Sequence, residues 1–192
     1  MTQAGVLRVI QLLWTAIFVI WAIASFTAKR TTESAPSEWK AKLALLAVWL
    51  SWWLALRQGN WPGLLATRFV PEGMPGAYVG LALTGLGLGF ALWARFYIGR
   101  NWDGMVVLKE DHQLVRTGPY SLVRHPIYSG FMLATLGTAI TQGEIGRLLA
   151  MPVIVIAWGY KARVEEAFLT RRFPQQYEQY RREVKALIPA VW

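Results

Sequence analysis

The chain has 192 residues, of which 55% are hydrophobic and 16% are charged, and its net charge is +9. Soluble domains usually contain about 25% charged residues, so this composition predicts a membrane protein with a single domain over residues 1–192. The basic residues flank apolar segments, which argues against nucleic-acid binding and favours contact with membrane lipids. With no cysteine and two histidines, the chain has no disulfides, and no metal site is expected.

Five apolar segments predict transmembrane helices, since a helix needs about 20 mostly apolar residues to span a bilayer. They are Val6–Thr27, Leu43–Leu56, Gly76–Tyr97, Tyr128–Ile140 and Leu148–Tyr160. The first is too long for the core of a signal peptide, so we interpret it as a retained anchor. The last two are short and indicate a helical hairpin that turns at Thr141–Arg147, with tilt or local thinning accommodating their length.

The remaining segments are predicted to lie at the membrane surface or outside it. Arg57–Pro75 contains several large apolar residues, which fits either a short amphipathic helix in the interface or an ordinary loop. The chain from Phe168 onward is expected to be helical and extramembrane. Proline does not fit inside a helix, so Pro174 should break or restart it before a final basic helix over Gln175–Lys185.

The distribution of basic residues predicts the orientation of the bundle. Sixteen of the 20 lysines and arginines lie in the loops after the first and third spans and in the C-terminal tail. The positive-inside rule therefore places the N-terminus outside and the C-terminus in the cytoplasm. The two densest polar stretches, Asn101–Tyr128 and Arg163–Lys185, should share the cytoplasmic side.

Arg124 and His125 are predicted to lie at the mouth of the fourth span, because Pro126 fits the first turn of a helix. Free backbone N–H groups at that position attract an anion such as a carboxylate, and Arg124 adds a permanently charged donor. A simpler interpretation is equally consistent with the residues. Arg124 is then one more cytoplasmic charge and His125 a helix cap.

Glu165 and Glu166 follow the fifth span directly. Adjacent helical residues point about 100° apart, so the two carboxylates cannot share one partner symmetrically. We expect one of them to face the bundle and the other to face water. Pairing with neighbouring lysines and arginines is the simpler alternative.

Both stretches carry a resemblance to a known family. The pattern Leu114-Val115-x-x-Gly118-Pro119-Tyr120-x-x-x-Arg124-His125-Pro126-x-Tyr128-x-Gly130 resembles the signature of the isoprenylcysteine carboxyl methyltransferases and their phospholipid N-methyltransferase relatives. The pattern Glu165-Glu166-x-x-Leu169-x-x-x-Phe173-x-x-x-Tyr177-x-x-Tyr180 resembles the second block of the same family. The resemblance covers Gly99–Pro189, roughly half of the chain. Pro174 departs from it, because the family usually has glycine there.

The resemblance implies an all-α, polytopic membrane bundle of five transmembrane helices with a cytoplasmic C-terminal helical segment. It implies an S-adenosylmethionine-dependent methyltransferase, with residues 1–98 as N-terminal spans and 99–192 as the cofactor-binding catalytic half. The implied cofactor-binding residues are His112, Leu114, Val115, Gly118, Tyr120, His125, Pro126, Tyr128, Glu165 and Glu166. The implied catalytic residues are Arg124, which would meet a carboxylate of cofactor or substrate, and Glu165 and Glu166.

The sequence predicts a lipophilic methyl acceptor but leaves several alternatives for its identity. Carboxyl O-methylation of an isoprenylcysteine is the family's namesake reaction, and a carboxylate is ionised at neutral pH and needs no base. A phospholipid amine, or another small lipophilic amine or thiol, is the nearest alternative, with Glu165 or Glu166 as proton acceptor for an amine. Two other classes remain. One is a sterol-type reductase that binds a nicotinamide nucleotide, although such chains are much longer, and the other is a non-catalytic membrane scaffold or regulator.

Overall fold

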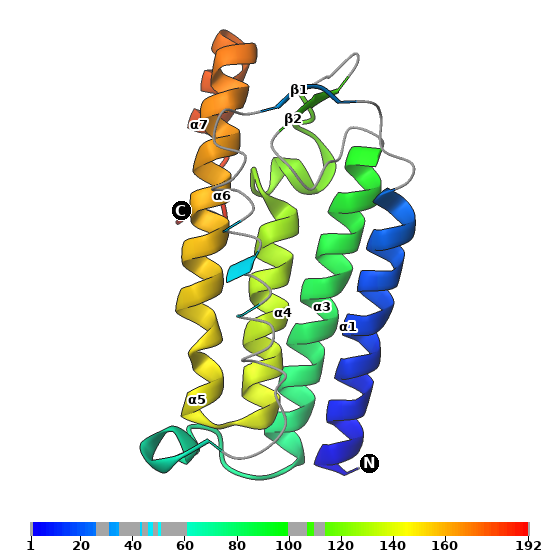
Figure 1. The fold of residues 1–192 in the computed structure, drawn as a ribbon, viewed down its shortest axis with the longest axis vertical. Coiled ribbons are helices and arrows are strands. Elements are labelled where there is room, and N and C mark those ends of the chain that lie inside the picture. The colour runs from blue at the N-terminus through cyan, green and yellow to red at the C-terminus, as the bar shows by residue number, and fades with distance from the viewer. Residues whose placement is uncertain are drawn as a thin grey trace.

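Four long helices lie side by side in the computed structural model (Figure 1). They are α1 (Gln3–Ser25), α3 (Met74–Ile98), α4 (Pro126–Gln142) and α6 (Ala150–Arg172). The structure describes residues 2–25, 31–34, 43, 46–47, 50, 61–99, 107–109 and 114–191. The shorter elements are the helices α5 (Ile145–Leu148) and α7 (Pro174–Glu183), the 3-10 turns η1 (Gly63–Ala66) and η3 (Gly118–Ser121), and the strands β1 (Thr31–Ser34) and β2 (Val107–Lys109).

The described part of the chain is therefore all-α apart from one short antiparallel strand pair, β1 with β2. Within it, three helical segments are long and apolar enough to cross a membrane, namely Gln3–Ala24, Met74–Ile98 and Ile145–Arg172. These match the predicted first, third and fifth spans. The predicted second span, Leu43–Leu56, lies largely outside the described residues.

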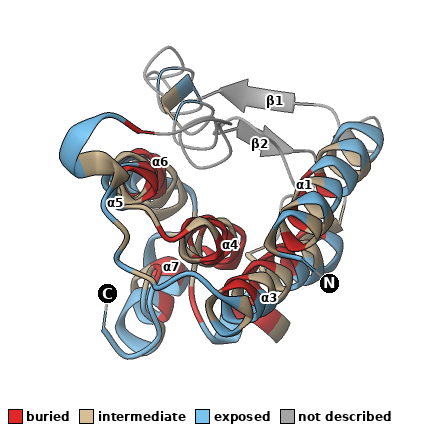
Figure 2. Ribbon diagram, turned by 90° about the horizontal axis from the view of Figure 1, so that it is seen from below, coloured by how far each residue is buried: buried red, intermediate tan, exposed pale blue. Residues whose placement is uncertain are grey.

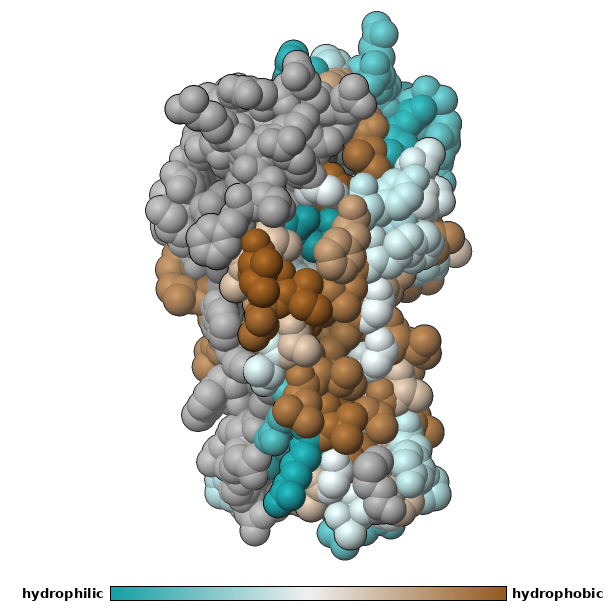
Figure 3. All heavy atoms as spheres, turned by 90° about the vertical axis from the view of Figure 1, so that its right-hand side faces the viewer, coloured by the Kyte–Doolittle hydropathy of each residue, from teal (hydrophilic) through white to brown (hydrophobic). Residues whose placement is uncertain are grey.

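The predicted fourth span is the 17-residue helix α4, which is shorter than a usual spanning helix. Seen along the bundle, α4 lies in the middle and is mostly buried (Figure 2). Its neighbours α1 and α3 instead present exposed apolar side chains, among them Leu12, Val19, Leu86 and Trp93. An apolar band covers the middle of this face, with polar residues towards its ends (Figure 3). Such a band is what a helix surface in contact with lipid requires.

Small residues allow α3 and α4 to pack backbone against backbone. A Cβ atom added to Gly87 would lie 2.5 Å from the Gly130 carbonyl oxygen, and one added to Gly137 would lie 2.5 Å from the Thr84 nitrogen. Thr84 also donates a 2.8 Å hydrogen bond to the Gly80 carbonyl within α3. Without a hydrophobic force between helices in lipid, such close contacts provide the association.

The predicted hairpin turn between the fourth and fifth spans is present. Gly143 ends α4 with φ +76°, a left-handed conformation that favours glycine. Its carbonyl accepts a 2.8 Å hydrogen bond from the Phe69 N–H, which ties the turn to the loop before α3. Of the two interpretations of that loop, the ordinary loop is correct for its described residues, because they contain only the single 3-10 turn η1 and no amphipathic helix.

The helix of the predicted fifth span is longer than its apolar run, since α6 continues to Arg172. It ends at Phe173, and α7 starts at Pro174, as the proline predicted. Beyond α7 the chain returns to the start of α4. Arg124 N–H donates to the Lys185 carbonyl at 2.8 Å, and His125 N–H donates to the Ala186 carbonyl at 3.0 Å.

Candidate active site

Polar side chains from both predicted stretches meet at one end of the bundle. This is the end where α1, α3 and α6 finish and α4 begins, opposite to α5 (Figure 1). Residues from η3, the start of α4, the last turns of α6 and the C-terminal segment lie together there. The two motif blocks are thus in direct contact, through pairs that lie 37 to 42 residues apart in the sequence.

An ion pair between Arg124 and Glu166 joins the two blocks. The Arg124 Nε and Nη2 atoms donate to the same Glu166 oxygen at 2.9 and 2.7 Å. Arg124 Nη1 donates to the carbonyl groups of Arg181, at 3.3 Å, and of Val184. A planar guanidinium can hold these partners at once. In the structure Arg124 therefore meets a carboxylate of the protein itself, Glu166, and its expected contact with a carboxylate of cofactor or substrate stays a prediction.

His125 lies between the two glutamates. Its Nε2 atom is 3.1 Å from a Glu166 oxygen and its Nδ1 atom is 3.4 Å from a Glu165 oxygen. Burial alone would lower the pKa of His125. The hydrogen bonds that Glu165 and Glu166 accept from the imidazole outweigh burial, so the pKa of His125 is raised. The imidazole can then be protonated on both nitrogens and donate to both carboxylates.

Glu165 belongs to a second group, with Lys161 and Tyr128. The Lys161 ammonium donates to Glu165 Oε1 at 2.5 Å and to the Tyr128 hydroxyl at 2.8 Å. The Tyr128 hydroxyl in turn donates to Glu165 Oε1. Glu165 thus faces Lys161 and Tyr128 within the bundle, whereas Glu166 lines the cavity described below, and their side chains are 21% and 13% exposed. The two neighbours point in different directions, as their helical spacing predicted. Arg124 and Arg181 contact the Glu166 carboxylate, and Tyr128 contacts the Glu165 carboxylate.

Aromatic rings stack beneath these charges. The Tyr128 ring lies parallel to His125 at 5.3 Å and to Trp158 at 4.2 Å. Phe131 continues the stack at 6.1 Å from Trp158. The site floor is therefore apolar, and it separates the charged cluster from the centre of the bundle.

The tyrosines of the two blocks form a supporting layer. Tyr180 donates to the Tyr120 carbonyl at 2.5 Å, and so ties α7 to η3. Burial raises the pKa of Tyr120, Tyr177 and Tyr180, which keeps all three phenols protonated. The Tyr177 hydroxyl is buried and makes no hydrogen bond within the described part of the chain.

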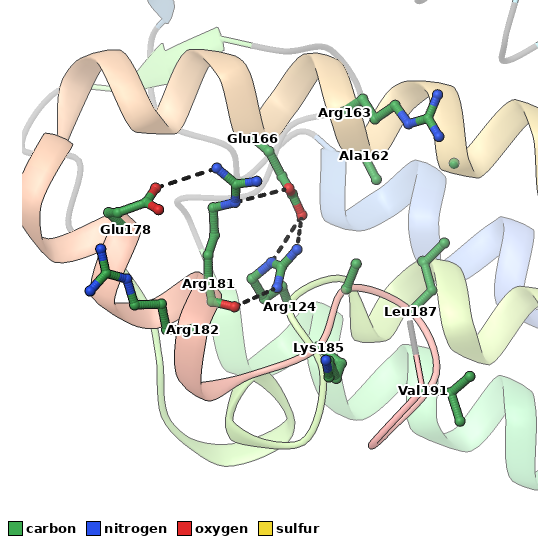
Figure 4. A pocket seen from close by; sticks show the side chains of 12 residues that line it. Arg124, Ala162, Arg163, Glu166, Glu178, Arg181, Arg182, Lys185, Leu187 and Val191 are labelled. Carbon is green, nitrogen blue, oxygen red and sulfur yellow. Dashed lines mark hydrogen bonds and ion pairs between the residues drawn. The ribbon is translucent and has the colours of Figure 1, made fainter.

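A cavity of about 450 Å³ opens beside the Arg124–Glu166 pair (Figure 4). Its charged lining residues are Arg124, Arg163, Glu166, Glu178, Arg181, Arg182 and Lys185, and its apolar lining includes Ala162, Leu187 and Val191. Figure 4 shows Arg124 and Arg181 both directed at the Glu166 carboxylate. Arg181 is 3.7 Å from Glu166 and 3.3 Å from Glu178.

The structure brings some of the predicted site residues together and separates others. Arg124, His125, Tyr128, Glu165 and Glu166 form the connected cluster, and Pro126 starts α4 beside it. Gly118 lies elsewhere, packed on the Tyr97 ring with φ +61°. Leu114 is partly buried, Val115 packs at the edge of the core below Tyr120, and His112 lies outside the described residues.

Sequence reasoning missed three contributors to this site. Lys161 was not counted among the site residues, although pairing of a glutamate with a neighbouring lysine was the simpler alternative, and the Lys161–Glu165 pair confirms that alternative for Glu165. Arg181 and the returning segment 184–187 were grouped with a basic tail. Their contacts with Arg124 depend on the chain folding back, which no local pattern indicates.

A bundle of helices with exposed apolar faces and one charged end that holds a cavity defines, for the described part of the chain, a membrane protein with a polar site at that end. The sequence model described as phospholipid methyltransferase matches residues 76–176, more than half of the chain. The chain belongs to that family. The resemblance drawn from the two motif blocks is thereby confirmed.

Individual relatives point in the same direction. Protein-S-isoprenylcysteine O-methyltransferase of Schizosaccharomyces pombe is 38% identical over 101 residues, which cover 51% of this chain and 43% of that protein. A probable protein-S-isoprenylcysteine O-methyltransferase of Oryza sativa subsp. indica is 28% identical over 120 residues, covering 60% of this chain and 62% of that protein.

A solved structure is also similar. It is described as the eukaryotic intramembrane Ras methyltransferase ICMT (isoprenylcysteine carboxyl methyltransferase), with a TM-score of 0.51 and 26% identity. The match covers 78% of this chain and 52% of that chain. The chain thus spans between two fifths and two thirds of the length of these relatives.

Proposed function

We propose that this chain is a membrane-embedded methyltransferase that uses S-adenosylmethionine and acts on a lipophilic acceptor, with carboxyl O-methylation of the isoprenylcysteine type as the reaction. The observation that carries this proposal is the joining of the two motif blocks by Arg124, Glu166 and His125 beside a cavity. The two distant blocks of the family signature meet in one connected cluster, which indicates a functional site. Basic residues that served only to orient the protein in the membrane would not need to meet.

The residues present fit the cofactor. S-adenosylmethionine carries a carboxylate, an ammonium group, ribose hydroxyls and a purine. The cavity offers arginine and lysine side chains for the carboxylate, glutamates for the ammonium or hydroxyl groups, and apolar surface at Leu187 and Val191 for the purine. Its volume of about 450 Å³ falls within the usual range of small-molecule sites, roughly 300–1,000 Å³.

When bound, the cofactor supplies an electrophilic methyl group on a sulfonium. The residues of this chain then hold and align the reactants and exclude water, and alignment alone can supply much of the rate. Arg124 and His125 keep the two carboxylates fixed, and the aromatic stack of Tyr128 and Trp158 closes the site from below. The other predicted cofactor-binding residues are described residues that do not line the cavity, or lie outside the described part of the chain, and their contact with the cofactor stays a proposal.

The charges of the site favour a carboxylate acceptor over an amine. All four oxygens of Glu165 and Glu166 already contact a donor, so neither carboxylate stands ready to take a proton from an amine. The cavity lining has five basic and two acidic residues, and this excess of positive charge attracts an anion. Phospholipid amine methylation remains the second candidate because of the family to which the chain belongs.

We further propose five transmembrane helices within one domain, with the N-terminus outside and the site in the cytoplasm. The support is geometric. α1 ends at the site end, whereas Trp61 packs on Gly146 at the opposite end, as a further crossing between Ser25 and Trp61 requires. The uneven distribution of the basic residues, with 16 of 20 in the loops and the tail of one side, supports the orientation.

Cofactor binding by the purified protein in lipid nanodiscs tests the proposal. Wild type is expected to bind S-adenosylmethionine, measured by calorimetry, and not to bind a nicotinamide nucleotide. Arg124→Ala and Glu165→Ala should each weaken binding at least tenfold, as expected when a buried charge pair is broken. Arg171→Ala, an exposed residue on the same helix as Glu165, is the control and should bind as wild type does.

A wild-type protein that does not bind S-adenosylmethionine contradicts the function, and unchanged binding in both site variants contradicts the site. Transfer of labelled methyl groups in membranes then identifies the acceptor. Label released by base marks methyl esters, whereas label retained in lipid headgroups marks amine methylation. Binding without transfer to any lipid extract would favour the non-catalytic alternative.

A further inference from the structure

Lys161 is a buried cation within a predicted membrane helix. The residue is 2% exposed and lies on α6, within the candidate span Ile145–Arg172. A charged side chain at such a position is costly unless it is paired, and for that reason it usually marks a functional site. Lys161 belongs to neither of the two motif blocks.

The contacts of Lys161 are specific. Its ammonium donates to the Tyr128 hydroxyl at 2.8 Å and to Glu165 Oε1 at 2.5 Å, and it lies 5.2 Å from the centre of the Tyr128 ring. Lys161 therefore sets the position of Tyr128 on α4 as well as of Glu165 on its own helix. Because the Tyr128 ring stacks on His125, fixing Tyr128 also fixes the orientation of the imidazole.

The charges facing His125 form two pairs. From α6, Glu165 is paired with Lys161 and Glu166 faces His125 directly. Arg124 beside His125 and Arg181 from α7 are the permanent cations of Glu166. Within the described residues, Lys161 is the one permanently charged partner of Glu165, and His125 is its other charged neighbour.

We propose that Lys161 is a positioning residue of the methyltransferase site, which holds Glu165 and Tyr128 in place whatever the protonation state of His125. Lys161 does not line the cavity, so it acts through Glu165 and Tyr128 and not on bound molecules. This inference rests on the proposed function for its effect on the cofactor, while its effect on the charge cluster is independent of it.

Removing Lys161 leaves the protonated His125 as the charged partner of Glu165. The pairing is then present at low pH and is lost as the imidazole deprotonates. The sign follows from the raised pKa of His125: its contribution is full below about 6.5, the usual histidine value, and disappears as pH rises through the higher pKa of the folded protein.

Cofactor affinity and thermal stability of Lys161→Met, measured in nanodiscs from about pH 6 to pH 9, test the proposal. Lys161→Met is expected to bind S-adenosylmethionine near wild-type affinity at the low end and about tenfold more weakly at the high end, the size of one lost charged hydrogen bond. Its melting temperature should fall more steeply with pH than that of wild type. Lys161→Arg should restore both profiles, and Arg171→Met is the charge-matched control.

A folded Lys161→Met protein with the wild-type pH profile would overturn the proposal. If this variant does not fold, Lys161→Gln replaces it, since the amide can still donate to Tyr128 without charge, and the same profiles are expected. A wild-type protein that fails to bind the cofactor contradicts the proposed function alone. The melting profile then still decides the role of Lys161.

Discussion

At the scale of single residues, the site is a set of matched charges. Arg124 and Lys161 are each paired with one glutamate, and His125 lies between the two carboxylates. The resemblance of the two motif blocks implied catalytic roles for Arg124, Glu165 and Glu166, and these roles stay predictions. It did not predict that Arg124 binds Glu166, because partners from separate segments of the chain meet only after the bundle forms.

Replacing Arg124 with lysine tests the geometry of the guanidinium. Lysine keeps the charge but cannot reach Glu166 and the Val184 carbonyl at once, so Arg124→Lys should lower stability by about 2 kcal/mol. Thermal unfolding in detergent measures the loss, and Arg171→Lys should show none. A melting temperature equal to that of wild type would mean that charge alone matters at this position.

At the scale of elements, apolar runs predicted most of the helices, and Pro174 predicted the break before α7. The last apolar run ended at Tyr160, but the helix expected from Phe168 to the break at Pro174 is confirmed, because α6 continues without interruption to Arg172. The strands β1 and β2 were not predicted either. Each is too short to show an alternating pattern and pairs with a segment far away in the chain.

The contact between α3 and α4 yields a prediction with an internal control. Gly87→Ala places a methyl group 2.5 Å from the backbone of α4 and should destabilise the protein by about 1–3 kcal/mol through overpacking. Gly85→Ala, on the same helix with nothing nearby, should be neutral or stabilising by up to about 1 kcal/mol. Thermal denaturation compares the two, and equal stability would show that the helices can separate without cost.

At the scale of the whole molecule, the bundle has one charged end and one end closed by tight turns. The concentration of basic residues in alternate loops predicted that one end of the bundle is charged. The return of the chain from α7 to the start of α4 could not be predicted. It rests on hydrogen bonds to the backbone carbonyls of Lys185 and Ala186, which residues of almost any type could accept.

The chain contains no cysteine, so single cysteines can report its orientation. Ser121→Cys in η3 and Gln175→Cys in α7 should react with an impermeant maleimide only after cells are opened. Glu72→Cys, at the other end of the bundle, should react in intact cells. Labelling of Ser121→Cys and Gln175→Cys from opposite faces of the membrane would show that the two blocks do not share one site.

The hydrogen bonds from Arg124 and His125 to the segment after α7 have a consequence for biosynthesis. The start of α4 finds its backbone partners only when the ribosome has added Lys185 and Ala186, some 60 residues later. Until that moment the helices can enter the bilayer, but the nascent chain lacks one wall of its pocket. A released chain that is cut short before Lys185 should therefore be inserted in the membrane yet unable to retain a ligand, because these hydrogen bonds are missing.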